Sequence, residues 1–234
     1  MGIKTEKEYE VHYYEVNYKL ECKISSIINY FCDIGTFQSE SLGVGIDYLT
    51  ERRLAWVFYR YDINIKRYPK FGEKIKVVTK AKSFKKFYAS REYEIYDENN
   101  EKIVDGEGIF LLINIDKRRA VRIPDDQYTA YGVELDEKSD IKIEKLEKLQ
   151  EVTSKNFFKV RYGDIDSNMH VNNVRYVEWA VESLPLEIVL NYELKDLSVV
   201  FEKECKYGAE IIASYELRED NDKTQAEIAK VLFT

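Results

Sequence analysis

The stretch Tyr68-Pro-Lys-Phe-Gly-Glu-Lys-Ile75 recurs in the second half of the chain as Glu204-Cys-Lys-Tyr-Gly-Ala-Glu-Ile211. The two stretches share a lysine, an aromatic residue, a glycine and an isoleucine in the same order, at an offset of 211 − 75 = 136 positions. Self-similarity at a fixed offset indicates an internal duplication in which each copy is one supersecondary unit. The sequence therefore predicts two similar domains.

The same order of elements surrounds each copy of this stretch. Hydrophobic periodicity in the first half predicts a strand at 9–21, a helix at 25–43, and strands at 53–65, 74–82, 88–96 and 102–115. In the second half it predicts a strand at 156–162, a helix at about 173–184, and strands at 195–203, 209–219 and 225–233. A strand, one helix and an antiparallel meander, repeated, indicate an α+β fold with two antiparallel sheets that each wrap a long helix.

The segment between the two halves has a different composition. A proline at position 124 and a charged stretch at 134–151, with apolar residues that suggest a short connecting helix, interrupt the strand pattern. We therefore expect an N-terminal domain at 1–122, a linker at 123–150 and a C-terminal domain at 151–234. The second half also lacks the last strand of the first half in this prediction.

The composition limits the class of protein. With 44% hydrophobic residues, 19 Tyr, 11 Phe and only 3 Pro, the chain is typical of a folded, strand-rich protein. It contains no apolar run of the roughly 18 residues that a membrane helix needs, and its polar start is unlike a signal peptide. We expect a cytoplasmic protein without membrane insertion. Three cysteines with no CxxC spacing predict reduced thiols and no disulfide framework, and we expect neither a metal nor a cofactor.

The charge is unevenly distributed along the chain. The net charge of −7 argues against nucleic-acid binding, which requires a basic surface. Residues 66–91 nevertheless contain eight Lys and two Arg against one acid, Glu73, and Lys117-Arg118-Arg119 with Arg122 forms a second basic cluster. An acidic partner could dock on these clusters. Alternatively, the lysines line the solvated face of a sheet and protect its edges.

Asp166, Asn168 and His170 stand at alternate positions just ahead of the predicted second helix, and His170 is one of only two histidines. In an extended segment, side chains two positions apart project to the same side, so the three could converge on one substrate. Asn172 or Asn173 would cap the helix, and its first N–H groups could then hold an oxyanion.

Each of these polar residues also has an ordinary structural explanation. Asp and Asn commonly form turns and caps, and a single histidine is often satisfied by core or loop contacts. These ordinary explanations are harder to defend when Glu204 is considered with the three residues. At the position equivalent to Glu204 the first half has Tyr68, and the first half contains no Asp-x-Asn-x-His.

The run from Asp166 to Val174 matches the motif Asp-x-Asn-x-His-Val-Asn-Asn-Val of the acyl-acyl carrier protein (acyl-ACP) thioesterases, which the second half resembles. In that family a catalytic Glu followed by Cys lies 34 residues after the His, and 204 − 170 = 34. The first half is similar in 43–60 and 65–72, so the resemblance covers roughly 9–234. The polar N-terminus, which is unlike a plastid transit peptide, favours the bacterial branch over the plant-plastid one.

The resemblance implies a tandem (double) hotdog fold, with a first domain that shapes the acyl pocket and a catalytic second domain. It implies hydrolysis of fatty acyl-ACP, which releases free fatty acid and terminates chain elongation. We hypothesise that Glu204 activates water or attacks directly, that His170 and Asn168 position the reacting groups, and that Asp166 orients His170. Helix N–H groups near Asn172 or Asn173 would hold the oxyanion, and Trp56 and Phe58 are candidates for acyl binding.

The thiol of Cys205 offers a different assignment within the same motif. Together with His170 and Asn168 it could form a Cys-His-Asn triad. However, a catalytic thiolate needs an electropositive setting, and the adjacent glutamate opposes it. We therefore expect Cys205 to be a packing residue.

The predicted partner is ACP carrying a fatty acyl chain, which is acidic and could be steered by the basic clusters. Two fused hotdogs reproduce the usual dimer in one chain, so a monomer suffices, although a homodimer remains an alternative. An acyl-coenzyme A thioesterase with the same residues is the second enzymatic hypothesis. A non-enzymatic acyl-binding or structural protein is disfavoured because only one repeat holds the full residue set, and a hotdog dehydratase because no proline-rich segment surrounds His170.

Overall fold

The computed structural model describes residues 2–134, 141, 143, 145–146, 149–166 and 169–217, and the backbone of 228–233. The chain forms two compact units. Unit 1 consists of residues 1–144 together with 194–200, and unit 2 of residues 145–193 together with 201–234. A short segment of the second half therefore belongs to the first unit.

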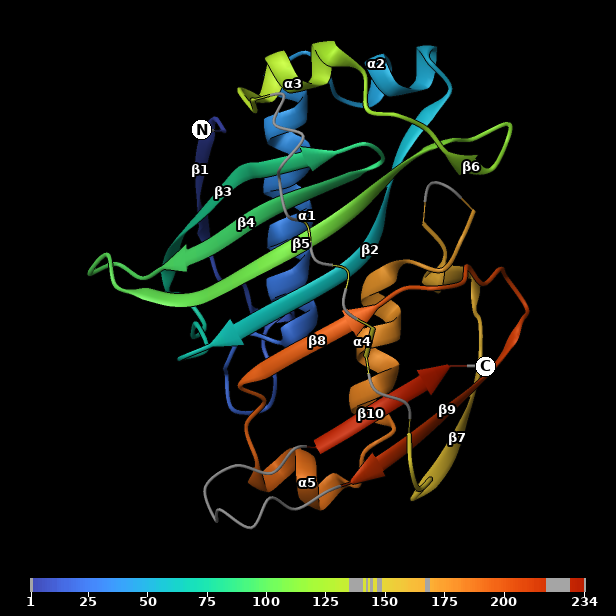
Figure 1. Ribbon diagram of the computed structural model, residues 1–234. Coiled ribbons are helices and arrows are strands. Elements are labelled where there is room, and N and C mark those ends of the chain that lie inside the picture. The colour runs from blue at the N-terminus through green and yellow to red at the C-terminus, as the bar shows by residue number, and fades with distance from the viewer. Residues whose placement is uncertain are drawn as a thin grey trace. The chain divides into compact units, whose positions relative to one another are not determined.

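Unit 1 is an antiparallel sheet packed against one long helix, α1 (Ile24–Ser41), which crosses its strands (Figure 1). The strand order is β1-β3-β4-β5-β2-β8, and β6 pairs with β5. The strands are β1 (Lys4–Glu10), β2 (Leu54–Ile65), β3 (Lys74–Lys85), β4 (Tyr88–Tyr96), β5 (Lys102–Asn114), β6 (Arg119–Ala120) and β8 (Asp196–Val200). Two short helices, α2 (Ile46–Glu51) and α3 (Asp125–Tyr131), complete the unit.

The core of unit 1 lies between α1 and the sheet. Ile27, Phe31 and Ile34 recur at helical spacing and are fully buried, and burial stabilises each such side chain by roughly 1.5–3 kcal/mol. The Phe31 ring stacks on Tyr93 at 4.5 Å. A Cβ at Gly106 of β5 would lie 3.2 Å from the Phe31 ring, so glycine at this position makes room for the helix.

A β-bulge in β2 decides which way its aromatic residues face. Phe58 pairs with Phe110 but Arg60 pairs with the preceding residue, Ile109, so one extra residue is inserted between Phe58 and Arg60. The insertion shifts the alternation by one, and Phe58 therefore lies on the same face as the buried Tyr61, with ring centroids 5.0 Å apart.

Unit 2 has its own sheet of three described strands in the order β10-β9-β7, all antiparallel. Its elements are β7 (Ser154–Lys159), α4 (Asn173–Glu182), α5 (Leu186–Asn191), β9 (Glu210–Leu217) and β10 (Ile228–Phe233). The helix α4 ends earlier than predicted because Pro185 disfavours helical geometry at the residue before it. The predicted strand at 195–203 exists as β8, but it pairs with β2 in unit 1.

Hydrogen bonds confirm the duplication. In unit 1 the Val11 N–H donates to the Glu73 carbonyl (3.0 Å), and the Gly72 N–H donates to the Val11 carbonyl (2.9 Å). In unit 2 Val160 stands in place of Val11, and its bonds with Ala209 (2.9 Å) and Gly208 (3.1 Å) are the same. The strand predicted at 9–21 is wrong beyond Val11: β1 ends at Glu10, Val11 makes the last two of these bonds, and the chain then enters a 3-10 turn, Tyr13–Glu15.

Part of the predicted linker at 123–150 is packed structure. Tyr128 and Tyr131 of α3 are buried and lie edge-on to Phe84, with ring centroids 5.1 and 5.6 Å apart. The connecting helix predicted further on lies mostly outside the described residues. In the portion of the chain described, no helix is both long and apolar enough to cross a membrane.

Candidate active site

The loop between β7 and α4 is anchored by Asp164. Its side chain is only 1% exposed, and its carboxylate accepts bonds from the Arg161 backbone N–H (2.8 Å) and guanidinium (3.1 Å). Burial alone raises the pKa of the Asp164 carboxyl, but the bonds and charge of Arg161, aided by Arg175, outweigh it and lower the pKa. The Asp164 carbonyl also accepts the Asn172 N–H (2.9 Å), which closes the loop.

Inside this loop, Asp166 and His170 are joined through their backbones. The Asp166 N–H donates to the His170 carbonyl (2.8 Å), and the Asp166 carboxylate accepts the His170 backbone N–H (3.3 Å). Met169 makes the turn with a positive φ of 64°. Asp166 thus holds the backbone that carries His170. Asn168 lies outside the described residues.

The structure brings His170 and Glu204 together. His170 Nε2 lies 3.3 Å from Glu204 Oε2, with side chains 24% and 38% exposed, so the pair is open to solvent and substrate. The Val171 N–H bonds the Cys205 carbonyl (2.9 Å), which fixes the segment carrying Glu204 to the loop carrying His170. A carboxylate beside an imidazole at this distance can exchange a proton with a bound water or substrate.

The residues that follow His170 form the N-terminus of α4. The Asn172 side chain caps it by accepting the Val174 N–H (3.0 Å), as one of the two predicted alternatives had it. The Asn172 carbonyl accepts the Arg175 N–H (2.9 Å). Asn173 is the first helical residue, and its N–H has no acceptor among the described residues. This amide is therefore the best candidate in the first turn for holding an oxyanion.

The equivalent loop of unit 1 has the same backbone without the same chemistry. Asn17 and Glu21 replace Asp166 and His170, and they form the same two bonds at 2.8 and 3.1 Å. Tyr68 replaces Glu204, and its hydroxyl donates to the Leu194 carbonyl (2.8 Å). The duplication thus provides an internal comparison: at the positions of His170 and Glu204 unit 1 has Glu21 and Tyr68. The imidazole of this loop, His12, lies 3.2 Å from Glu15, and these two stand at the positions of Arg161 and Asp164.

The remaining candidates are Cys205 in unit 2 and Trp56 and Phe58 in unit 1. Cys205 is partly buried against the core of unit 2, and its N–H donates to the Tyr176 hydroxyl (3.2 Å). Burial raises the pKa of Tyr176. Trp56 and Phe58 belong to unit 1, where they are half-buried and lie near Phe84 and Phe110, with ring centroids 6.2 and 4.6 Å apart.

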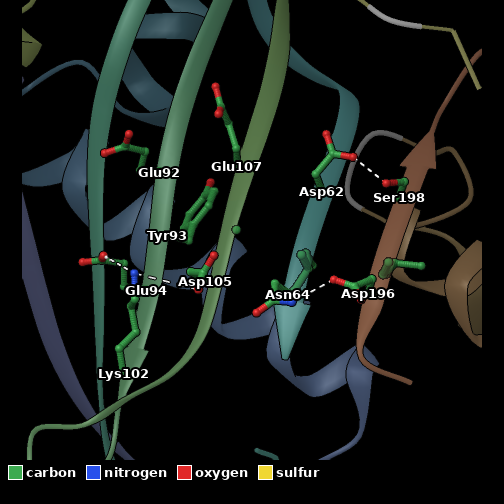
Figure 2. A pocket seen from close by; sticks show the side chains of 13 residues that line it. Asp62, Asn64, Glu92, Tyr93, Glu94, Lys102, Asp105, Glu107, Asp196 and Ser198 are labelled. Carbon is green, nitrogen blue, oxygen red and sulfur yellow. Dashed lines mark hydrogen bonds and ion pairs between the residues drawn. The ribbon is translucent and has the colours of Figure 1, made fainter. Parts of the chain in front are cut away.

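An open hollow of about 430 Å³ on unit 1 spans β4, β5, β2 and β8 (Figure 2). One cation, Lys102, lines it together with six carboxylates. These are Asp62, Glu92, Glu94, Asp105, Glu107 and Asp196. Acyl chains require apolar walls, so this hollow is unsuited to them. None of the candidate residues lines it.

Sequence reasoning missed Asp164 and Arg161. The signal available was the Arg-x-x-Asp spacing directly before the motif, which allows the two side chains to meet across one turn. Asp164 closes the loop because its backbone carbonyl also accepts the Asn172 N–H, and the sequence does not predict this contact.

Comparisons with known proteins show the family of the chain. The model of the acyl-ACP thioesterase N-terminal domain matches residues 2–131, and that of the C-terminal domain matches residues 146–232. An acyl-[acyl-carrier-protein] hydrolase of Cuphea viscosissima is 28% identical over 217 residues, covering 88% of this chain and 53% of the relative. An oleoyl-acyl carrier protein thioesterase of Coriandrum sativum is 26% identical, covering 96% of this chain and 66% of the relative.

The chain therefore spans less than two thirds of the length of these curated relatives. Among solved structures, a protein from Lactobacillus plantarum provisionally described as an oleoyl thioesterase superposes with a TM-score of 0.88 at 23% identity, over 100% of this chain and 91% of that one. This likeness establishes the fold, and the tandem hotdog prediction is confirmed.

Proposed function

Because the chain belongs to the acyl-ACP thioesterase family, we propose that it hydrolyses the thioester of a fatty acyl chain on ACP, releasing the free acid and ending its elongation. The observation that carries the proposal is the 3.3 Å contact between His170 and Glu204 at the capped start of α4. Its absence from the otherwise equivalent loop of unit 1 argues that the pair is kept for chemistry rather than for folding.

The reaction adds water to the thioester carbonyl and breaks the carbon–sulfur bond. In the first alternative, Glu204 accepts a proton from water as the water oxygen bonds to the carbonyl carbon. The tetrahedral oxyanion then collapses, the carbon–sulfur electron pair leaves with the pantetheine sulfur, and a proton passes to that sulfur through His170. In the second alternative, the Glu204 carboxylate attacks the carbonyl carbon, the carbon–sulfur bond breaks, and the pantetheine sulfur leaves with a proton delivered through His170. Water then hydrolyses the resulting anhydride to the fatty acid and the free Glu204 carboxylate.

The neighbouring groups complete this arrangement. The Asn173 N–H would stabilise the oxyanion, Asp166 would hold the His170 backbone, and Asn168 would position the reacting groups. Trp56 and Phe58 are candidates for the wall of the acyl site, because apolar aromatic surface suits an alkyl chain. The carrier-bound substrate fits a cytoplasmic enzyme that acts as a monomer or homodimer.

Hydrolysis of acyl-ACP substrates of different chain length tests the proposal. We expect Glu204→Gln to lower kcat by about 10³-fold, as loss of a general base or nucleophile does. We expect Cys205→Ala, the matched variant at the next residue, to retain turnover within about threefold, since a packing residue contributes little to kcat. An inert Cys205→Ala variant with an unchanged Tm would contradict the assignment.

Labelled water separates the two roles of Glu204. In a single turnover in H₂¹⁸O, ¹⁸O in the Glu204 carboxylate would demonstrate direct attack, because activation of water places the label only in the fatty acid. Acyl-coenzyme A of equal chain length is the comparison for carrier preference. Equal kcat/KM for both thioesters would favour the broader hotdog class over a carrier-specific enzyme.

A further inference from the structure

Three cations of the basic run at 66–91 form ion pairs in unit 1. Lys80 and Lys82 lie 2.8 and 3.4 Å from Glu92, and Lys82 lies 3.0 Å from Glu107. Arg67 pairs with Glu73 and with Asp97, at 2.7 and 3.1 Å. The alternative explanation of this run, lysines lining a solvated sheet face, therefore suits Lys80 and Lys82.

The sheet face next to these lysines carries paired charges. Of the six carboxylates that line the hollow in Figure 2, five form ion pairs, with Arg60, Lys80, Lys82 and Lys102. These cations already have carboxylate partners, so this face offers an acidic partner little attraction.

One end of the same sheet is basic, and we call it the basic patch: Lys85, Lys86, Lys117, Arg118, Arg119 and Arg122. Backbone bonds bring its segments together. The Ile123 N–H donates to the Lys86 carbonyl (2.8 Å), and Arg119 of β6 pairs with Asn114 of β5. The β3–β4 and β5–β6 turns consequently lie at one end of the sheet (Figure 1).

The charges of the basic patch are available to a partner. All of its residues except Lys85 are exposed, and Lys86, Lys117, Arg119 and Arg122 form no ion pair with any described residue. The one acid in the β5–β6 turn, Asp116, is bound to Arg53 at 2.5 Å. Phe87 and Ile115, which are 37% and 36% exposed, supply apolar surface beside these cations.

We propose that the basic patch docks the acidic carrier protein that presents the acyl chain, an inference that rests on the proposed thioesterase function. The whole chain has a net charge of −7, so a similarly acidic carrier needs a local positive surface to approach productively. The patch offers this surface at the end of the sheet, whereas cations of the neighbouring sheet face are already ion-paired. Phe87 and Ile115 among these cations suit an interface with an apolar centre and a charged rim.

The test compares two double charge reversals on two substrates. Lys117→Glu with Arg119→Glu removes the centre of the basic patch. Lys66→Glu with Lys155→Glu changes the net charge equally at exposed positions outside it. The substrates are acyl-ACP and the N-acetylcysteamine thioester of the same acyl chain, which carries no charge.

For acyl-ACP at low salt, we expect kcat/KM of the patch variant to fall by about tenfold, chiefly through KM, and the difference to shrink as salt is added. For the Lys66/Lys155 variant, kcat/KM for acyl-ACP should stay within about twofold of the wild-type value. Both variants should hydrolyse the uncharged thioester with the kcat/KM of the wild type. The inference would be overturned by an equal loss of kcat/KM for acyl-ACP in both variants, or by an unchanged kcat/KM in the patch variant. It would also be overturned if the patch variant lost kcat/KM on both substrates at unchanged Tm. If the wild type hydrolyses neither thioester, the proposed function itself fails.

Discussion

Among single residues, Asp164 is the carboxylate on which the loop of the candidate site depends. Its pKa is lowered in the folded state, so the unfolded chain takes up a proton first as the pH falls. The stabilisation is therefore complete above the ordinary aspartate pKa of about 3.9 and is lost as the pH drops below it. At neutral pH we expect Asp164→Asn to lower the free energy of unfolding by roughly 1.5–3 kcal/mol, the usual contribution of hydrogen bonds to a charged group.

Urea denaturation of both proteins between pH 7 and pH 3 checks this expectation. The difference between wild type and Asp164→Asn should narrow toward pH 3, because the wild-type carboxylate loses its charge there. A difference that stays constant with pH would mean that Asp164 acts through shape alone. Arg161→Gln, which removes the partner cation and leaves the backbone bonds, should show part of the same effect.

Met169 tests the backbone geometry of the turn that presents His170. It has a φ of 64°, and Leu20 at the equivalent position of unit 1 has a φ of 58°, so the duplicated loop requires this conformation. Left-handed geometry costs a non-glycine residue about 1–2 kcal/mol, and β-branched residues tolerate it worst. We expect Met169→Val to destabilise the protein by about 1–2 kcal/mol and Met169→Gly to be neutral or stabilising, measured as unfolding free energies. Equal stability of the two variants would contradict the argument.

The two parts of the candidate pair were predicted from residue identity, but their meeting depends on the fold. His170 and Glu204 are 34 positions apart, and only the resemblance suggested that they belong together. In the structure, the bond between Val171 and Cys205 makes the contact. No residue pattern specifies that bond, because it depends on how the loop folds back onto the segment after β8.

At the level of elements, long periodic segments were predictable and loops were not. The helix predicted at 25–43 is α1, and the four strands of the first meander fall close to their predicted positions. The segment 11–21 was misread as strand because apolar and polar residues alternate from Tyr14 to Glu21, although Tyr13, Tyr14 and Tyr18 are exposed. The bulge that turns Phe58 inward was also unpredictable, because register is a property of strand pairs.

The cap of α4 connects the stability of this element with the candidate chemistry. We expect Asn172→Ala to lower the free energy of unfolding by about 1 kcal/mol, because the Val174 N–H loses its acceptor. It should also lower kcat, since a frayed first turn no longer holds the Asn173 N–H in place. Asn172→Ser, which keeps a capping oxygen, should retain most of the wild-type free energy of unfolding and most of the wild-type kcat. Thermal unfolding and acyl-ACP kinetics measure the two effects, and an uncapped helix with full kcat would exclude the Asn173 amide as oxyanion donor.

At the level of the whole molecule, composition predicted an acidic protein with basic clusters but could not say which cations are paired. Which cations are paired depends on the order of the strands in the sheet. Lys82 on β3 reaches Glu107 on β5 because only one strand, β4, separates β3 from β5. Lys117 and Arg119, in and beside the β5–β6 turn, form no ion pair with any described residue. The same 36 basic residues thus include neutralised surface and a basic patch.

The chain's division into units makes a final prediction. Unit 1 is completed by β8, which pairs with β2 from Arg60 to Asn64 and adds the bonds Ser198–Asp62 (2.6 Å) and Asn64–Asp196 (2.8 Å). A fragment of residues 1–144 would expose β2 as an unpaired edge, and such edges promote association. We expect this fragment to self-associate in size-exclusion chromatography with light scattering. A synthetic peptide of residues 194–200 should reduce the association, whereas a scrambled peptide of the same composition should not, because the bonds to β2 depend on register. A fragment that stays monomeric alone would mean that β8 is dispensable for unit 1.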